Sequence, residues 1–332
     1  MDRTGDRETA PGPWQHAAVT DRAAAGEGAD FRELTAPYTA ELHLHCYRML
    51  GSLADADDVL QEVLLAAWQG LAGFAGRSSL RTWLYRIATN RCLNAIRAGH
   101  RRPRPEPIPP FDAPAPSRRD AVTWLQPYPD RPGIGADPAA RVEAQETVQL
   151  AFVVALQRMP PRQTAALLLC DVLAFSPAEA AGMLDTTSTA VTGLLQRARE
   201  ALRVDPAAVH RPDAQEEALA GRFADAFVRD DVAAVIALLT DDAWLTMPPA
   251  PHEYSGAEAI GGFLRASLSW RTGRRLELRP TRANGQPAFR CCLADDGGAG
   301  TRSLGLVVLT MSGGRISRVT RFLDAAPADR FG

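Results

Sequence analysis

Apolar residues recur every three or four positions in two long stretches of the chain, from about Phe31 to Ala98 and from about Arg141 to Val204. This spacing places them on one face of a helix, so each stretch is predicted to form a small all-α domain. Residues 103–138, between the two stretches, include eleven prolines and are predicted to form a linker. The first 29 residues lack both patterns and are predicted to be disordered.

The pattern changes after about residue 206. Helical segments at about 213–229, 231–240 and 256–270 are followed by strand-like runs. Asn284-Gly285 and Gly313-Gly314 each separate two such runs, which predicts two β-hairpins. The predicted organisation is a disordered N-terminus (1–29), a first all-α domain (30–102), a Pro-rich linker (103–140), a second all-α domain (141–205) and an α+β domain (206–332).

Composition places the chain among ordinary globular proteins, because 46% of its 332 residues are hydrophobic and its formal net charge is −2. The N-terminal stretch lacks the apolar core of a signal peptide, and no run is long enough to span a membrane, so we expect a cytoplasmic protein. The five cysteines show no metal-binding spacing. His43, His45 and Cys46 do not all share one helical face, so neither a metal nor a cofactor is expected.

Two neighbouring helical segments carry opposite charge. From Arg77 to Arg104 there are eight arginines and no carboxylate, whereas residues 55–68, DADDVLQEVLLAAW, are acidic on one side. The polar side carries Asp57, Asp58, Gln61 and Glu62, and the apolar side, predicted to be core, carries Leu60, Val63, Leu64, Ala67 and Trp68. Taken alone, the acidic side would be interpreted as a solvated face. Adjacent surfaces of opposite sign instead suggest two different partners.

The basic helix lies in LRTWLYRIATNRCLNAIRAGHRR, residues 80–102. Its outward stripe consists of Arg86, Asn90, Asn94, Arg97 and Arg101. Guanidinium and amide groups on one stripe suit phosphates and base edges, so nucleic-acid contact is favoured over a merely soluble surface. Trp83 is predicted to be core, and stacking on unpaired bases is the alternative.

A helix-turn-helix is predicted in FSPAEAAGMLDTTSTAVTGLLQRAREALR, residues 175–203. Ser176, Pro177 and Glu179 are typical of a helix start, and Ser188 is expected to cap a second helix after a tight turn. Ala181 and Val191 suit the crossing point of the two helices. The second helix presents a stripe that suits the major groove, with Thr189, Thr192, Gln196, Arg199 and Arg203 on it and Arg197 within reach of phosphate. A plain helical hairpin is the alternative.

The order of these parts resembles the sigma-70 family of RNA polymerase initiation factors, in its small extracytoplasmic-function (ECF) group. CYRMLGSLADADDVLQEVLLAAW is similar to the polymerase-binding region, SSLRTWLYRIATNRCLNAIRA to the −10-binding helix, and MPPRQTAALLLCDVLAFSPAEAAGMLDTTSTAVTGLLQRAREAL to the −35-binding domain. The resemblance implies a non-catalytic factor that binds promoter DNA and the clamp of the largest subunit of core RNA polymerase.

The resemblance also implies a role for individual residues. The polymerase contacts would be Asp57, Asp58, Leu60, Gln61 and Glu62. The −10 contacts would be Arg77, Arg86, Asn90, Arg91, Asn94 and Arg97, with the loop from Phe74 to Ser79. The −35 contacts would be Ser188, Thr189, Thr192, Gln196, Arg197, Arg199 and Arg203.

The C-terminal block, beginning at FADAFVRDDVAAVIALLTDDAWLTMPPAPHEYSGAEAIGGFL, resembles a SnoaL-like domain, a cone-shaped α+β barrel that polyketide cyclases and ketosteroid isomerases also use. This implies a regulatory domain that could hold a small ligand. Candidates for proton transfer are Asp241, Asp242, His252, Glu253 and Tyr254. Retained catalysis is not favoured, because Asp241 and Asp242 fit a turn at a helix end and His252 an exposed loop.

Two alternatives come from other functional classes. One is a cyclase- or isomerase-type enzyme with a DNA-binding front half, and the other is a ligand-sensing helix-turn-helix repressor that never contacts polymerase. The acidic helix argues against the repressor, which has no need of a clamp-binding face.

The linker contains TWLQPYPD, residues 123–130. Burial of Trp124, Leu125 and Tyr128 can return roughly 1.5–3 kcal/mol each, so we expect them to have a docking site. Pro127 and Pro129 hold the segment extended. A subset of ECF factors combines a similar segment with the C-terminal extension, so docking is expected on the third domain or its junction with the first. Docking would then set the spacing of the DNA-binding domains; pinning to the first domain for stability alone is the alternative.

Overall fold

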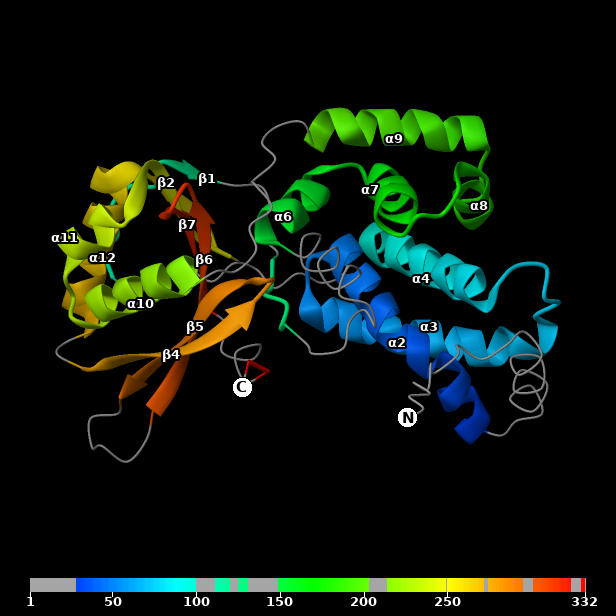
Figure 1. Cartoon of the computed structure of the whole chain (residues 1–332), viewed down its shortest axis with the longest axis horizontal. Helices are drawn as coiled ribbons and strands as arrows, with labels where there is room; N and C mark the ends of the chain where they lie inside the picture. Colours follow the sequence, from blue (N-terminus) through cyan, green and yellow to red (C-terminus); the bar gives the residue numbers. More distant parts are fainter. Residues whose placement is uncertain are drawn as a thin grey trace, which may run out of the picture.

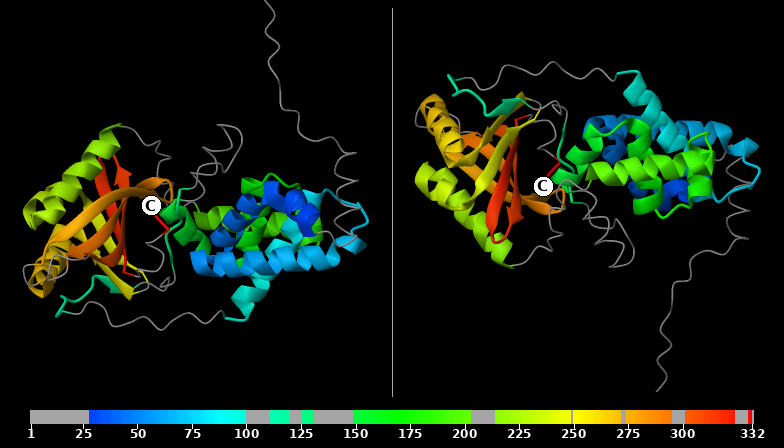
Figure 2. Two further views of the ribbon diagram at one scale, coloured as in Figure 1. Left: turned by 90° about the horizontal axis from the view of Figure 1, so that it is seen from below. Right: turned by 90° about the horizontal axis from the view of Figure 1, so that it is seen from above.

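The computed structural model of the chain describes residues 28–99, 111–119, 125–130, 149–202, 214–248, 250–271, 274–294, 301–323 and 330–331. They form two lobes that lie side by side along the longest axis of the molecule (Figure 1). One lobe holds both helical domains and the other holds the sheet, as views from below and above also show (Figure 2). Residues 1–27 of the predicted N-terminus, Trp124 and Arg203 lie outside the described residues.

The first domain is a packed set of helices with polar caps. Its elements are α2 (Gly28–Leu50), α3 (Leu53–Gly70), the short 3₁₀ turn η1 (Leu71–Gly73) and α4 (Leu80–Arg97). The Ser52 hydroxyl accepts a hydrogen bond from the Asp55 amide at the start of α3, and the Ser79 hydroxyl accepts one from the Thr82 amide at the start of α4. Such caps satisfy amides that have no partner inside the helix.

The second domain contains the predicted helix-turn-helix. Its elements are α6 (Leu150–Arg158), α7 (Pro161–Leu167), the wide turn η2 (Leu168–Val172), α8 (Pro177–Met183) and α9 (Ser188–Leu202). The predicted start of α8 is confirmed, because Ser176 and Glu179 form a reciprocal capping box. The predicted cap of α9 is wrong by one residue: Ser188 is already helical, and the Thr187 hydroxyl accepts the bond from the Ala190 amide at 3.2 Å.

The third domain combines helices with a mixed sheet. Its elements are α10 (Ala214–Val228), α11 (Val232–Ala237), β2 (Leu239–Met247), β3 (Ala250–Ser255), α12 (Gly256–Arg271), β4 (Leu276–Ala283), β5 (Gln286–Ala294), β6 (Thr301–Ser312) and β7 (Arg315–Phe322). The linker adds β1 (Arg118–Arg119), and the sheet order is β1-β3-β2-β7-β6-β5-β4. Only the β2–β7 pairing is parallel among these neighbours.

The hairpin predictions are confirmed, and one helix prediction is too long. Asn284 and Gly285 both have positive φ (56° and 69°) between β4 and β5, as a tight hairpin turn requires. The helix expected to reach residue 240 ends at Ala237, and the chain enters β2 at Leu239. Asp241 and Asp242 therefore lie in a strand and not in a turn at a helix end.

Alternate residues of the strands face two different cores. Val307 and Leu309 pack with α10–α12 on one face of the sheet. Leu306 and Val308 face the opposite way and share a core with the helical domains, which joins the two lobes. In the part of the chain that the structure describes, no helix has the length and apolar character needed to cross a membrane.

Candidate protein and nucleic-acid interfaces

The polar side of α3 forms an acidic face, which comprises Asp57, Asp58, Leu60, Gln61 and Glu62. Asp58, Gln61 and Glu62 are exposed, and Leu60 is partly buried against the helical core. Asp57 differs, because only 28% of its side chain is exposed. Its position on the helix predicts a solvated carboxylate, but groups from two distant segments contact it.

Two large apolar side chains extend the acidic face. Leu65 is 52% exposed and Trp68 is 48% exposed. The prediction that Trp68 is core was wrong. Val59, Val63 and Ala67 already form the buried row at four-residue spacing, and Trp68 lies about 100° around the helix from Ala67. That spacing is the signal that could have identified Trp68 as exposed.

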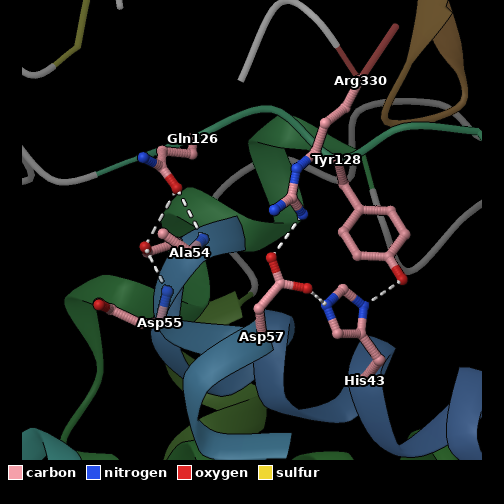
Figure 3. A network of polar contacts seen from close by, with 8 residues as sticks. His43, Ala54, Asp55, Asp57, Gln126, Tyr128 and Arg330 are labelled. Atoms are coloured by element: carbon pink, nitrogen blue, oxygen red, sulfur yellow. Dashed lines mark hydrogen bonds and ion pairs between the residues drawn. The ribbon is translucent and has the colours of Figure 1, made fainter. Parts of the chain in front are cut away.

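His43 of α2 connects the acidic face to the linker (Figure 3). Its Nδ1 lies 2.8 Å from the Tyr128 hydroxyl, and its Nε2 lies 3.0 Å from an Asp57 carboxylate oxygen. The other Asp57 oxygen forms an ion pair with Arg330, near the C-terminus. The next residue, Phe331, is buried in the helical core. The chain thus brings its C-terminal end onto the acidic face.

The linker segment 125–130 lies between the first and third domains. Leu125 and Tyr128 are buried. Gln126 Oε1 accepts hydrogen bonds from the Ala54 amide (3.0 Å) and the Ser52 hydroxyl (3.2 Å), at the start of α3. The Tyr128 amide donates to Asn284 Oδ1 at 2.7 Å, and the Asn284 amide donates to the Tyr128 carbonyl at 2.8 Å. The segment therefore contacts both lobes.

Asn284 was predicted only as a turn residue, yet it contacts the first domain directly. It is fully buried, and its Nδ2 donates to the Tyr47 hydroxyl at 2.8 Å. Tyr47 in turn donates to the Gln126 carbonyl at 2.9 Å. Burial raises the pKa of Tyr47 well above its ordinary value, so its hydroxyl keeps the proton that this bond requires.

A groove lies between α3 and α4. It has a volume of about 540 Å³, and its lining includes Trp83, Arg86, Asn90, Arg91 and Asn94. These four polar residues were predicted as −10 contacts, and the fold brings them together with the indole of Trp83. Trp83 is only partly buried, packed at 5.0 Å (ring centroids) against Phe74, so it is not wholly a core residue. Arg77 and Arg97 are also exposed.

The second domain packs against α4. The Asn90 side-chain amide donates to the Met183 carbonyl of α8 at 3.2 Å. The Tyr85 and Phe175 rings meet edge to face at 5.4 Å, and the Arg81 guanidinium lies over the Phe175 ring at 4.8 Å. One of the predicted −10 side chains is thus engaged by the other DNA-binding domain.

The outer stripe of α9 is exposed. It carries Ser188, Thr189, Thr192, Gln196, Arg197 and Arg199. Arg199 makes a two-pronged contact with the Asp171 carboxylate, at 2.8 Å through Nε and 2.7 Å through Nη2. This pairing was not predicted from the sequence.

The predicted proton-transfer residues of the third domain do not surround one site. Asp241 and Asp242 are exposed on β2. Glu253 is buried beside Arg118 of the linker, and the Tyr254 hydroxyl donates to the Pro114 carbonyl at 3.0 Å. Glu253 and Tyr254 therefore contact the linker. Within the described residues, no cluster of three or more His, Cys, Asp and Glu side chains is arranged to hold a metal ion.

Comparison with known families accounts for all three domains. A model of sigma-70 region 2 matches residues 35–102, a model of sigma-70 region 4 matches 149–202, and a model of the SnoaL-like domain matches 220–319. The ECF RNA polymerase sigma factor SigG of Mycobacterium tuberculosis is 44% identical over 316 residues, which are 91% of this chain and 84% of the relative. The chain belongs to the ECF sigma factors of the sigma-70 family.

This sigma factor is similar to other members with known structure. The ECF sigma factor SigJ of M. tuberculosis is 31% identical over 227 residues, which are 66% of this chain and 67% of SigJ. A crystal structure of SigJ aligns with a TM-score of 0.59 and 24% identity over 88% of this chain and 95% of that one. That likeness supports the fold, two helical sigma domains followed by a SnoaL-like domain.

The chain is thus an alternative sigma factor, which directs promoter-specific transcription initiation by RNA polymerase. Core RNA polymerase and promoter DNA are its partners. The alternatives of an enzyme with a DNA-binding half and of a repressor are not favoured.

Proposed function

We propose that the acidic face of α3 binds the clamp of the largest polymerase subunit through Asp57, Asp58, Leu60, Gln61 and Glu62. Leu65 and Trp68 extend this contact, because an exposed aromatic residue beside apolar and charged groups suits a protein interface. The proposal is supported by the continuity of these residues along one exposed side of the helix.

The groove between α3 and α4 binds the −10 element in this proposal. Its guanidinium and amide groups suit phosphates and base edges, and the indole of Trp83 offers a stacking surface for an unpaired base. The residues assigned are Arg77, Arg86, Asn90, Arg91, Asn94 and Arg97. On α9, the −35 contacts are Ser188, Thr189, Thr192, Gln196, Arg197 and Arg199, with Arg203 beyond the described end of the helix.

The packed arrangement of the lobes is a closed form of the sigma factor in this proposal. The Met183 carbonyl competes with a base for the side-chain N–H group of Asn90. Arg330 and His43 compete with a cation of the clamp for the oxygens of Asp57. Activation therefore requires that the third domain release the linker and the C-terminal residues, which is the regulatory role of the SnoaL-like domain.

No enzymatic step is assigned to the SnoaL-like domain, because Glu253 and Tyr254 contact the linker. A hollow bordered by Phe227, Val235 and Leu264 has a volume of about 10 Å³, the size of one water molecule. A metabolite would not fit there.

The ion pair between Arg330 and Asp57 carries the proposal, and core-polymerase binding tests it. Asp58→Lys should weaken binding about tenfold or more, because an exposed carboxylate on the interface is reversed in charge. Arg330→Ala should strengthen binding by up to about fivefold, since an ion pair that is partly exposed contributes about 0.2–1 kcal/mol to the closed form.

Asp242→Lys is the matched control, because Asp242 is an exposed carboxylate on the third domain. It should leave binding unchanged. Unaltered binding of a folded Asp58→Lys variant would remove the assignment of the acidic face. If only Arg330→Ala left binding unaltered, the acidic face would keep its assignment, and only its regulation by the C-terminal residues would be removed.

A further inference from the structure

Linker residues 111–119 cross the edge strand of the third domain. Their last two residues form β1, which pairs antiparallel with β3 in the register Arg118 opposite Glu253 and Arg119 opposite His252. β1 lies at one end of the sheet order, so β3 would be an edge strand without it. Addition of a strand to an exposed edge is a common way in which domains bind extended peptides.

The first part of the segment makes one ring contact and two hydrogen bonds with the third domain. Phe111 packs against Phe263 of α12 with 5.5 Å between the ring centroids. The Tyr254 hydroxyl donates to the Pro114 carbonyl at 3.0 Å. The Ser255 amide donates to the Ser117 hydroxyl at 3.0 Å. The start of the segment is thus held by side chains of α12 and β3 and by a backbone amide of β3.

Near the end of the segment, Arg118 is held by an acid and an aromatic ring. Its Nε and Nη2 lie 2.8 Å and 2.6 Å from Oε2 of Glu253, and its guanidinium carbon lies 4.7 Å from the centre of the Trp244 ring. Trp244 and Glu253 share one face of the sheet, because Glu253 pairs with Thr246, two residues from Trp244.

Glu253 and Trp244 belong to the third domain, whereas Arg118 belongs to the linker. Glu253 is only 4% exposed, while the Arg118 side chain is about half exposed. A buried carboxylate requires a cationic partner, and Arg318 supplies only a longer contact, at 3.9 Å. A carboxylate beside an indole face selects the planar guanidinium over an ammonium group.

We propose that Trp244, Glu253, Tyr254 and Phe263 form a peptide-binding site of the third domain. Its ligand is an extended segment with an aromatic residue, a proline three positions later and an arginine seven positions later. Residues 111–119, FDAPAPSRR, occupy it in cis. The SnoaL-like domain therefore recognises the linker as a peptide at this site, separately from the contacts of residues 125–130.

Binding of a peptide in trans to the full-length chain tests this site. The probe is a fluorescein-labelled FDAPAPSRR peptide, and binding is followed by anisotropy. The wild-type chain should bind it weakly, because the tethered copy has an effective concentration of the order of millimolar. Phe111→Ala with Arg118→Ala weakens the cis segment and leaves the receiving residues intact. This double variant should bind the probe about tenfold more tightly than wild type, or better.

The matched control is Asp112→Ala with Arg119→Ala, which changes two exposed residues of the same segment. It should bind the probe as weakly as wild type. Glu253→Gln, added to the first double variant, should lower affinity about tenfold or more. A probe with Lys in place of its first Arg should bind the double variant with an affinity lowered by a similar factor. This change is in the probe, so it cannot affect the folding of the protein.

Equal affinity of wild type and the double variant for the probe would overturn the proposal. The proposal would also be overturned if the double variant bound the Lys-containing probe as tightly as the original probe. Neither measurement contains polymerase or promoter DNA, so the result is independent of the proposed interfaces for those partners.

Discussion

His45 shows how burial fixes the protonation of one side chain in the first domain. Its ring is fully buried, its Nε2 lies 3.0 Å from the Thr89 hydroxyl, and its edge meets Tyr85. Burial, together with the positive charges of Arg48 and Arg81, lowers the pKa of His45 from 6.5 to about 3. The imidazole is therefore neutral in the folded protein at any physiological pH.

This lowered pKa predicts a loss of stability in acid. Between about pH 6.5 and pH 3 the unfolded chain binds a proton at His45 that the folded chain does not, so stability is complete above the unfolded pKa and falls as pH decreases. His45→Gln should reduce this dependence by up to about 1.4 kcal/mol per pH unit. Urea unfolding of both proteins between pH 4 and pH 7 measures the difference; identical slopes would contradict it.

At the scale of a single helix, the proposed −35 contact of α9 requires Arg199 to exchange an intramolecular partner for DNA. Arg199 is bound by Asp171 in this structure, whereas Gln196 is exposed on the same helix. Asp171 therefore acts against any phosphate contact of Arg199. In the proposed −35 contact, base-directed and phosphate-directed side chains of the stripe would make separate contributions.

Substitutions on α9 should separate these two kinds of contact. Gln196→Ala should weaken −35 binding by about 1–3 kcal/mol if it contacts a base. Arg199→Ala should lower the dependence of log K on log salt by about 0.9 for one lost phosphate contact, and Asp171→Asn should strengthen binding by freeing Arg199. Arg222→Ala, at an exposed position on α10, is the control. If the Gln196→Ala and Arg199→Ala variants formed promoter complexes with the same stability and salt dependence as those of wild type, the stripe would be only solvated surface.

The elements could be predicted where local pattern decides them. The capping box at Ser176 and the turn at Asn284-Gly285 follow from neighbouring residues alone, and both are present. The error at Trp68 arose within a single helix. Trp68 was assigned to the core because it falls at helical spacing with the other apolar residues of α3, although the row of Val59, Val63 and Ala67 was already sufficient to bury that side of the helix.

The contacts between lobes could be predicted only in part. Docking of the linker between the first and third domains was expected from its apolar residues, and Leu125 and Tyr128 are buried there. Neither the insertion of Asn284 nor the pairing of Arg330 with Asp57 has a local signal, because each joins residues more than 200 positions apart. Such pairs follow from how whole domains pack.

At the scale of the whole molecule, Asn284 is positioned to couple the third domain to the linker and to the first domain. Its side chain binds the linker at Tyr128 and the first domain at Tyr47, and both contacts are buried. In the proposed closed form these bonds must break before the lobes separate. Two such hydrogen bonds contribute about 1–3 kcal/mol to the closed form, which corresponds to a factor of roughly 5–150 in the population of the open form.

Asn284→Gly removes these bonds and keeps the turn, because glycine adopts the positive φ of this position without strain. The full-length variant should support more run-off transcription with core polymerase than wild type, and it should begin to unfold at a lower temperature. Asn284→Asp keeps the acceptor for the Tyr128 amide and loses the donor to Tyr47. Its run-off transcription should therefore lie between that of wild type and that of Asn284→Gly. A lower melting temperature with unchanged transcription would mean that the contact stabilises the fold without restraining the sigma factor.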